Sequence, residues 1–160
     1  MRMSTDAPTA PVTDLAVGAE EHVGFLLRLA YQRASANLTD AIGASGLTPM
    51  QFQTLRRLRQ RGQMTQNELG RSVGMPPANI HSTVRRLRAS QLVAIRPSPV
   101  DKRVILVELT TRGKDTLRRV IPAADAANAH TLSVLTHTEQ KALMDSLWKL
   151  AAGSRAIATP

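Results

Sequence analysis

Residues 76–89 read PPANIHSTVRRLRA, and this stretch decides the fold because its apolar residues recur at helical spacing. Ile80, Val84 and Leu87 follow the i, i+4, i+7 pattern of a helix that packs one side on a core. At about 3.6 residues per turn, the opposite face and its flanks carry small, polar and cationic residues: Ala78, Asn79, His81, Ser82, Arg85 and Arg86. A helix divided in this way suits insertion into the major groove of duplex DNA.

The residues before this stretch predict two further helices with marked beginnings. In residues 64–69, MTQNEL, Thr65 suits an N-cap and Glu68 can reach back to it. Residues 47–51, LTPMQ, repeat the pattern with Thr48 and Gln51, and predict a helix to about residue 61. Gly74 stands where a tight turn needs a residue without Cβ. A helix-turn-helix motif is therefore expected.

After residue 91 the sequence period changes from helical to extended. The β-branched runs 92–95 and 104–107 predict two strands, separated by a proline-rich, charged surface loop at residues 96–103. Strand, loop and strand together predict a β-wing beside the two helices. Thr110 then begins a long helix to about residue 130, and Thr136 with Glu139 begins the last one.

Helices are also predicted at the two ends of the chain, and part of the first is expected to pack on a second subunit. An apolar stripe of Val23, Leu26, Leu27, Ala30, Ala34, Leu38 and Ala41 is wider than a small domain needs, which indicates a second subunit. The last helix is expected to direct inward Ala142, Leu143, Leu147 and Leu150.

Positive charge is concentrated in the middle of the chain. The formal net charge is +9, but residues 48–114 hold 13 Lys and Arg against three acids, a net +10. A polyanion is the expected partner of such a segment. A solvated basic face is the other explanation for arginines on one helix, and the helix-turn-helix pattern favours nucleic acid over it.

Other classes of function find little support in the sequence. There is no cysteine, and the four histidines are scattered, so neither disulfides nor a metal site is expected. No set of nucleophile and base and no phosphate-binding glycine loop indicates an enzyme or a cofactor. No apolar run approaches the roughly 18 residues of a membrane span, and no signal-peptide core is present, so a cytoplasmic location is expected.

The order of these elements resembles the MarR family of bacterial transcription regulators. The resemblance covers about residues 17–152, and its most specific stretches are 47–52 (LTPMQF), 65–69 (TQNEL), 99–104 (PVDKRV) and 109–113 (LTTRG). It implies a mostly α fold with a small β-wing. Residues 47–109 would form a winged helix-turn-helix lobe, flanked by dimerisation helices at 15–46 and 110–152. A flexible arm is expected at 1–14 and a flexible tail at 153–160.

The family resemblance also implies a symmetric homodimer that places helix 76–89 in the major groove and wing 96–104 in the minor groove. Arg103 matches the residue expected to enter the minor groove, and Asp101 the carboxylate that orients it; Asp101 could also stabilise the turn. A narrow A·T minor groove attracts an arginine at a loop tip. The predicted DNA-binding residues are Asn79, His81, Ser82, Arg85, Arg86, Arg96, Asp101, Lys102 and Arg103.

Two positions depart from the family pattern. Gln91 stands where many members have glycine before the first wing strand, which predicts a strained or differently closed turn. Ser82 stands where an arginine is frequent in the recognition helix, with His81 beside it. Base reading would then depend more on Asn79, Ser82, Arg85 and Arg86, and the target DNA sequence stays open.

Family members commonly bind small anionic aromatic compounds between the dimer helices and the DNA-binding lobe. The matching residues here are His22, Phe25, Arg28, Tyr31 and Met50. Arg28 could pair with a carboxylate and His22 could hydrogen-bond a hydroxyl, although each residue also has an ordinary structural explanation. The block 22–28, HVGFLLR, resembles regulators of nicotinate catabolism, which suggests a hydroxypyridine carboxylate.

The sequence thus predicts a ligand-responsive, dimeric transcription repressor that binds palindromic duplex DNA and is released by an aromatic carboxylate effector. The alternative is a winged-helix module that binds RNA or protein without small-molecule control. Competition between duplex DNA and RNA would separate the two.

Overall fold

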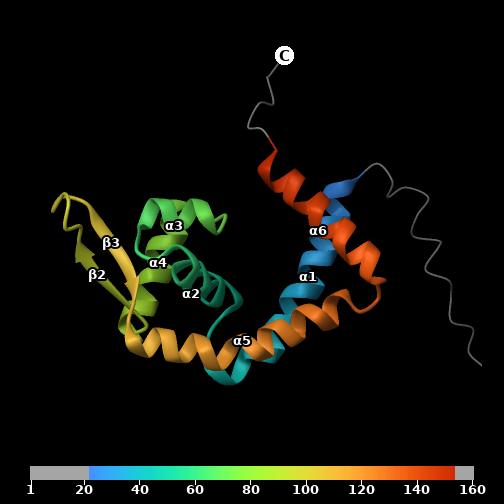
Figure 1. Cartoon of the computed structure of the whole chain (residues 1–160), viewed down its shortest axis with the longest axis horizontal. Coiled ribbons are helices and arrows are strands. Elements are labelled where there is room, and N and C mark those ends of the chain that lie inside the picture. The colour runs from blue at the N-terminus through green and yellow to red at the C-terminus, as the bar shows by residue number, and fades with distance from the viewer. Residues whose placement is uncertain (1–21, 154–160) are drawn as a thin grey trace, which may run out of the picture.

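The computed structural model describes residues 22–153, so the predicted arm 1–14, the start of the first predicted helix and the tail beyond residue 153 lie outside the described residues. Figure 1 shows a lobe that contains α2, α3, α4 and the β-hairpin, from which α1 and α5 lead away together. The elements are α1 (Val23–Ile42), η2 (Gly43–Ser45), α2 (Pro49–Arg61), β1 (Met64–Thr65), α3 (Gln66–Ser72), α4 (Pro77–Ala89), β2 (Val93–Pro97), β3 (Ile105–Leu109), α5 (Thr111–Leu132) and α6 (His137–Ala152). This architecture confirms the predicted fold class.

Threonine side chains begin four of the helices, as the sequence predicts. Thr48, Thr65 and Thr136 complete capping boxes with Gln51, Glu68 and Glu139 at the starts of α2, α3 and α6, and Thr110 caps α5. The hydrogen bonds from the backbone and hydroxyl of Thr65 lower the pKa of Glu68. The capped residues therefore fix where the chain enters each helix.

The sheet has three antiparallel strands in the order β1-β3-β2. The short strand β1 was not predicted, because it has only two residues and one of them also caps α3. The predicted strands 92–95 and 104–107 are also corrected to 93–97 and 105–109, since the ladder continues until Pro97 pairs with Ile105. Proline is tolerated there because β2 is an edge strand.

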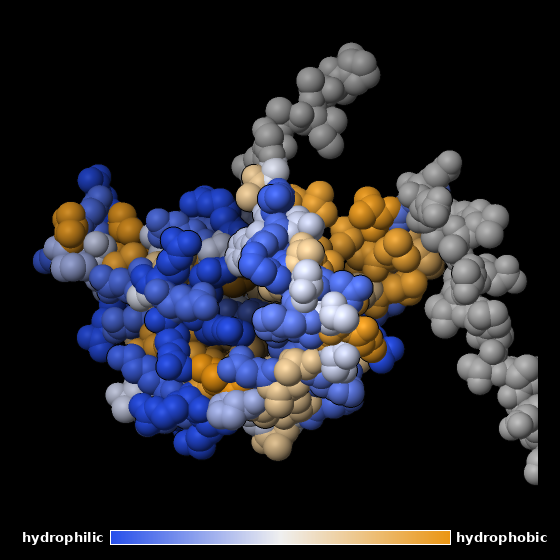
Figure 2. Space-filling view, turned by 45° about the vertical axis from the view of Figure 1, so that its right-hand side comes forward, coloured by the Kyte–Doolittle hydropathy of each residue, from blue (hydrophilic) through white to orange (hydrophobic). Residues whose placement is uncertain are grey.

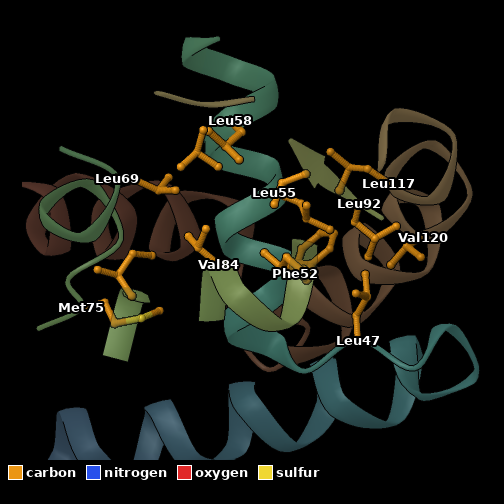
Figure 3. Packing of buried hydrophobic residues seen from close by; sticks show 14 of the residues in the cluster. Leu47, Phe52, Leu55, Leu58, Leu69, Met75, Val84, Leu92, Leu117 and Val120 are labelled. Carbon is orange, nitrogen blue, oxygen red and sulfur yellow. The ribbon is translucent and has the colours of Figure 1, made fainter. Parts of the chain in front are cut away.

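The core of the lobe is built around α2. Figure 3 shows Leu55 and its neighbours on α2 between two groups of apolar side chains, one from the helix-turn-helix and one from β2 and α5. The first group includes Leu69, Met75 and Val84, and the second Leu92, Leu117 and Val120. Because one helix contacts both groups, α2 joins the recognition elements to α5 in a single core.

The two end helices leave their apolar faces uncovered. In α1 only Ile42 is buried, and α6 has no buried residue, so the predicted inward burial on α6 is not found within one chain. Trp148 of α6 is 64% exposed, and Val23 of α1 is equally so. Figure 2 shows a large apolar surface at the side of the molecule away from the wing. None of the described helices has the length and apolar character of a membrane span.

The first turn of α5 packs tightly on the turn that joins α4 to β2. The hydroxyl of Thr110 donates to the Gln91 carbonyl at 2.7 Å, and the Thr110 amide donates to the Leu92 carbonyl at 3.2 Å. A Cβ added to Gly113 would overlap the Leu92 carbonyl oxygen. Gln91 itself has φ 60°, in the left-handed region that disfavours side chains. The predicted strain at this position is confirmed.

We expect Gly113→Ala to lower the free energy of unfolding by about 2 kcal/mol or more, because the methyl group would displace backbone rather than a flexible side chain. Gly43→Ala is the matched control, since a Cβ there meets nothing within 4 Å and Gly43 has φ −52°. Urea unfolding should show a large loss for the first variant and little or none for the second. Equal stability of the two would contradict the close contact.

Candidate nucleic-acid interface and ligand cavity

Helix α4 has the two-sided character that its sequence predicts. Ile80, Val84 and Leu87 are buried in the core. Pro76 is the N-cap residue rather than the first helical residue, and α4 runs from Pro77 to Ala89. The side away from the core is exposed at Asn79, His81, Arg85 and Arg86 and half-buried at Ser82. The core contact thus fixes the helix while leaving all five predicted contact residues on its outer side.

The tip of the wing holds an arginine above a well-bonded turn. Asp101 Oδ1 accepts hydrogen bonds from the backbone amide of Arg103 at 3.0 Å and from its Nε at 3.3 Å. The Val104 amide donates to the Asp101 carbonyl, and the Ser98 amide donates to the Val104 carbonyl. The Arg103 side chain is 92% exposed. One carboxylate therefore both closes the turn and orients the guanidinium, which are the two compatible roles considered for Asp101.

The other two basic residues predicted in the wing have different positions. Arg96 lies on β2, not in the loop, and its Nε is 2.6 Å from Oε1 of Glu108 on β3. Lys102 is exposed at the tip. Arg96 is thus paired with the neighbouring strand although its side chain is 72% exposed, whereas Arg103 lies in the loop at the tip.

A cavity of about 260 Å³ lies between α1, α2 and α5. Its lining contains Tyr31 and Met50, two of the five predicted effector residues, and Arg56 is the only charged side chain among the described residues that line it. The Nη1 of Arg56 lies 4.0 Å from Oδ1 of Asp125, an exposed and loose ion pair. The volume lies just below the roughly 300–1,000 Å³ range of ligand sites, which suits a compound no larger than a single ring.

The remaining predicted effector residues do not line this cavity. His22 is the N-cap residue of α1, and Phe25 and Arg28 lie in its first turns. All three residues are exposed, and the Arg28 guanidinium lies 5.3 Å from the centre of the Phe25 ring. Their role in binding an effector stays a prediction.

Several polar residues of the cavity were missed by the sequence reasoning: Ser35, Gln53, Arg56, Asn128 and Thr131. Gln53 and Arg56 could have been found, because they follow Met50 on one side of α2 at steps of three residues. Asn128 and Thr131 could not, because their position depends on the packing of α5 on α1. That packing includes a 2.9 Å hydrogen bond from Asn37 Nδ2 to Thr131 Oγ1. Among residues 22–153, no three metal-ligating side chains come together.

Comparison with known proteins gives consistent relatives. The family model described as "MarR family" matches residues 45–104. The HTH-type transcriptional repressor NicR of Pseudomonas putida is 35% identical over 150 residues, which cover 94% of this chain and 95% of that protein.

Solved structures show the same similarity. A probable transcriptional regulator from Pseudomonas aeruginosa is 37% identical with a TM-score of 0.76, covering 82% of this chain and 98% of the other. BpsR of Bordetella bronchiseptica is 32% identical with a TM-score of 0.79, covering 84% and 96%. That structure is described as explaining how 6-hydroxynicotinic acid regulates DNA binding by BpsR.

Proposed function

The chain belongs to the MarR family, and from this premise we propose that it is a dimeric repressor that binds duplex DNA and responds to an aromatic carboxylate. The observation that carries the proposal is the exposed basic side of α4 together with Arg103 at the wing tip, both fixed by contacts within the lobe. Since duplex DNA is the partner, we expect the protein to act in the cytoplasm.

Two features support insertion of α4 and the wing into DNA grooves. The outer side of α4 offers amide, hydroxyl and guanidinium groups that can hydrogen-bond base edges and phosphates. The Arg103 side chain is 92% exposed at the wing tip, so it can enter a minor groove, where A·T-rich sequence concentrates negative potential. The distance between the two elements is fixed by the shared core and by β2, which follows α4 directly.

Dimerisation is supported by the uncovered apolar residues of α1 and α6. Leu26, Trp148 and Leu150 are half or more exposed in the single chain. Apolar area of this kind stabilises a soluble protein only when another surface covers it. A two-fold dimer would cover it and present two copies of α4 to half-sites roughly 34–36 Å apart in palindromic DNA.

The cavity between α1, α2 and α5 is the proposed effector site. Arg56 can bind a carboxylate bidentately, while Tyr31, Met50 and Leu38 surround an aromatic ring. BpsR is regulated by 6-hydroxynicotinic acid, and we propose a hydroxypyridine carboxylate of this type here. Because the lining comes from α2 of the lobe and from α1 and α5 outside it, a bound ligand can favour one orientation of the lobe over another.

We expect Arg103→Ala to weaken binding to operator DNA about tenfold or more, since an arginine that contacts DNA directly contributes about 1–3 kcal/mol. Val100→Ala is the control, because Val100 is 95% exposed at the same tip but carries no charge. Fluorescence anisotropy at physiological salt measures both. Unchanged affinity of Arg103→Ala would contradict the wing assignment, and equal competition by RNA would favour the RNA-binding alternative.

We expect sedimentation equilibrium to show a dimer, and Trp148→Glu to raise its dissociation constant about a hundredfold or more, because a buried unpaired carboxylate costs several kcal/mol. Val100→Glu introduces the same charge on the wing, far from α1 and α6, and should leave the dimer intact. A wild-type monomer at micromolar concentration would rule out binding to two half-sites.

We expect 6-hydroxynicotinate to bind the wild type and Arg56→Gln to weaken this binding about tenfold or more, because a charge-assisted pair is lost. Arg57→Gln is the matched control, since Arg57 is the next residue on α2 but does not line the cavity. Isothermal titration with the acid and with 6-hydroxynicotinamide separates charge from shape. If the neutral amide bound wild type as well as the acid did, Arg56 would not be the anchor.

A further inference from the structure

A second cavity lies on the other side of the lobe from the wing tip, where α1 ends and α5 begins. Its volume is about 680 Å³. The lining comes from the end of α1, η2, the start of α2, the end of α4 and the first half of α5. It shares no lining residue with the proposed effector site between α1, α2 and α5. It is therefore a separate cavity.

The lining of this cavity combines arginines with buried apolar residues. Arg112 and Arg119 are seven residues apart on α5, so they project from one face of the helix, with Thr116 between them. The two arginines are exposed, and the lining also includes buried apolar residues: Ile42, Leu47, Leu87, Leu92 and Val120. No aspartate or glutamate is among the described lining residues, and within residues 22–153 neither arginine forms a salt bridge.

This combination selects the chemistry of the ligand. Two guanidinium groups without a carboxylate partner attract an anion, and their planar donors match a carboxylate. The buried apolar residues of the lining favour a hydrocarbon body attached to that carboxylate. The volume of about 680 Å³ admits a two-ring compound, whereas the cavity beside Arg56 has only about 260 Å³.

One of the two arginines also supports the strained turn before the wing. Arg112 Nη1 donates to Gln91 Oε1 at 3.2 Å, and Gln91 has φ 60°. Ser90 and Leu92, the neighbours of Gln91, both line the cavity. A carboxylate accepts hydrogen bonds from a guanidinium more strongly than an amide oxygen does. An anion in the cavity would therefore compete with Gln91 for Arg112.

We propose that this cavity binds a small-molecule carboxylate through Arg112 and Arg119, and that binding loosens the turn at residues 90–92. The turn joins α4 to β2, so the ligand would change the order of the segment between the recognition helix and the wing. Gln91 would keep its Thr110 hydrogen bond and lose the one from Arg112. The cavity would thus be a second regulatory site, next to the start of α5.

The test uses full-length protein carrying Arg56→Gln, so that the first cavity is weakened as a carboxylate site. The probe is 2-naphthoate, with neutral 2-naphthamide as its matched compound. Isothermal titration should show one saturable naphthoate site per chain. Adding Arg119→Gln should weaken it about tenfold or more. Adding Arg118→Gln should not, because Arg118 is the adjacent arginine on α5 but lines a different pocket and pairs with Asp115.

Hydrogen exchange of the peptide that spans residues 90–92 measures the effect on the turn. Naphthoate should speed its exchange about threefold or more, a change that reflects loss of local stability. With Arg112→Gln, exchange should already be fast without the probe, and the probe should add little. No saturable binding, equal binding of the amide, or no loss in Arg119→Gln would overturn the site. Binding without faster exchange at residues 90–92 would overturn the proposed effect on the turn.

Discussion

The contact of Gly113 with the Leu92 carbonyl is the constraint on which the arrangement of the molecule depends. It brings the first turn of α5 against the α4–β2 turn, so that the long helix starts at the junction of recognition helix and wing. Farther along, the same helix packs on α1 through contacts such as Asn37 with Thr131. One long helix therefore connects the basic lobe to the uncovered apolar helices.

The close approach also explains the unusual backbone at Gln91. A left-handed residue lets the chain reverse from α4 into β2 within three residues, and glycine would adopt it without strain. Here the Gln91 carbonyl and side chain instead receive hydrogen bonds from Thr110 and Arg112. These contacts come from the start of α5 and its N-cap residue, and the Gln91 amide also donates to the Arg88 carbonyl of α4. The turn is thus sensitive to what the start of α5 contacts.

The sequence predicts the locally determined parts of the fold well. Capping at Thr48, Thr65 and Thr136 and the buried stripe of α4 depend on residues within one or two helical turns. Strand β1 could not be predicted, since a two-residue strand has no period and exists only because β3 pairs with it. The predicted ends of β2 and β3 also differ from the observed ones, because pairing between the two strands decides where each strand ends.

The candidate site also has parts that depend on local sequence and parts that depend on long-range packing. The exposed side of α4 and the Asp101–Arg103 turn follow from short-range pattern, and the structure places these residues as expected. The cavity beside Arg56 depends on three helices that are distant in sequence, so only Tyr31 and Met50 were found in advance. No residue of α6 is buried within the single chain, so its apolar pattern did not predict a packing partner in this fold.

Both cavities are lined by α5, and this shared helix constrains how two ligands could act. Ala124, Asn128 and Thr131 line the smaller cavity, while Arg112, Thr116 and Arg119 line the larger one nearer the start of the helix. A ligand shifts the equilibrium between two conformations of a protein only by the difference in its affinity for them. At the smaller cavity that difference would arise from the angle between α2 of the lobe and α1. At the larger cavity it would arise from the Arg112–Gln91 contact inside the lobe. These two changes involve different contacts along α5, so one ligand could affect the other only through this helix. Any such coupling would be reciprocal, because each ligand would change the affinity of the other by the same factor.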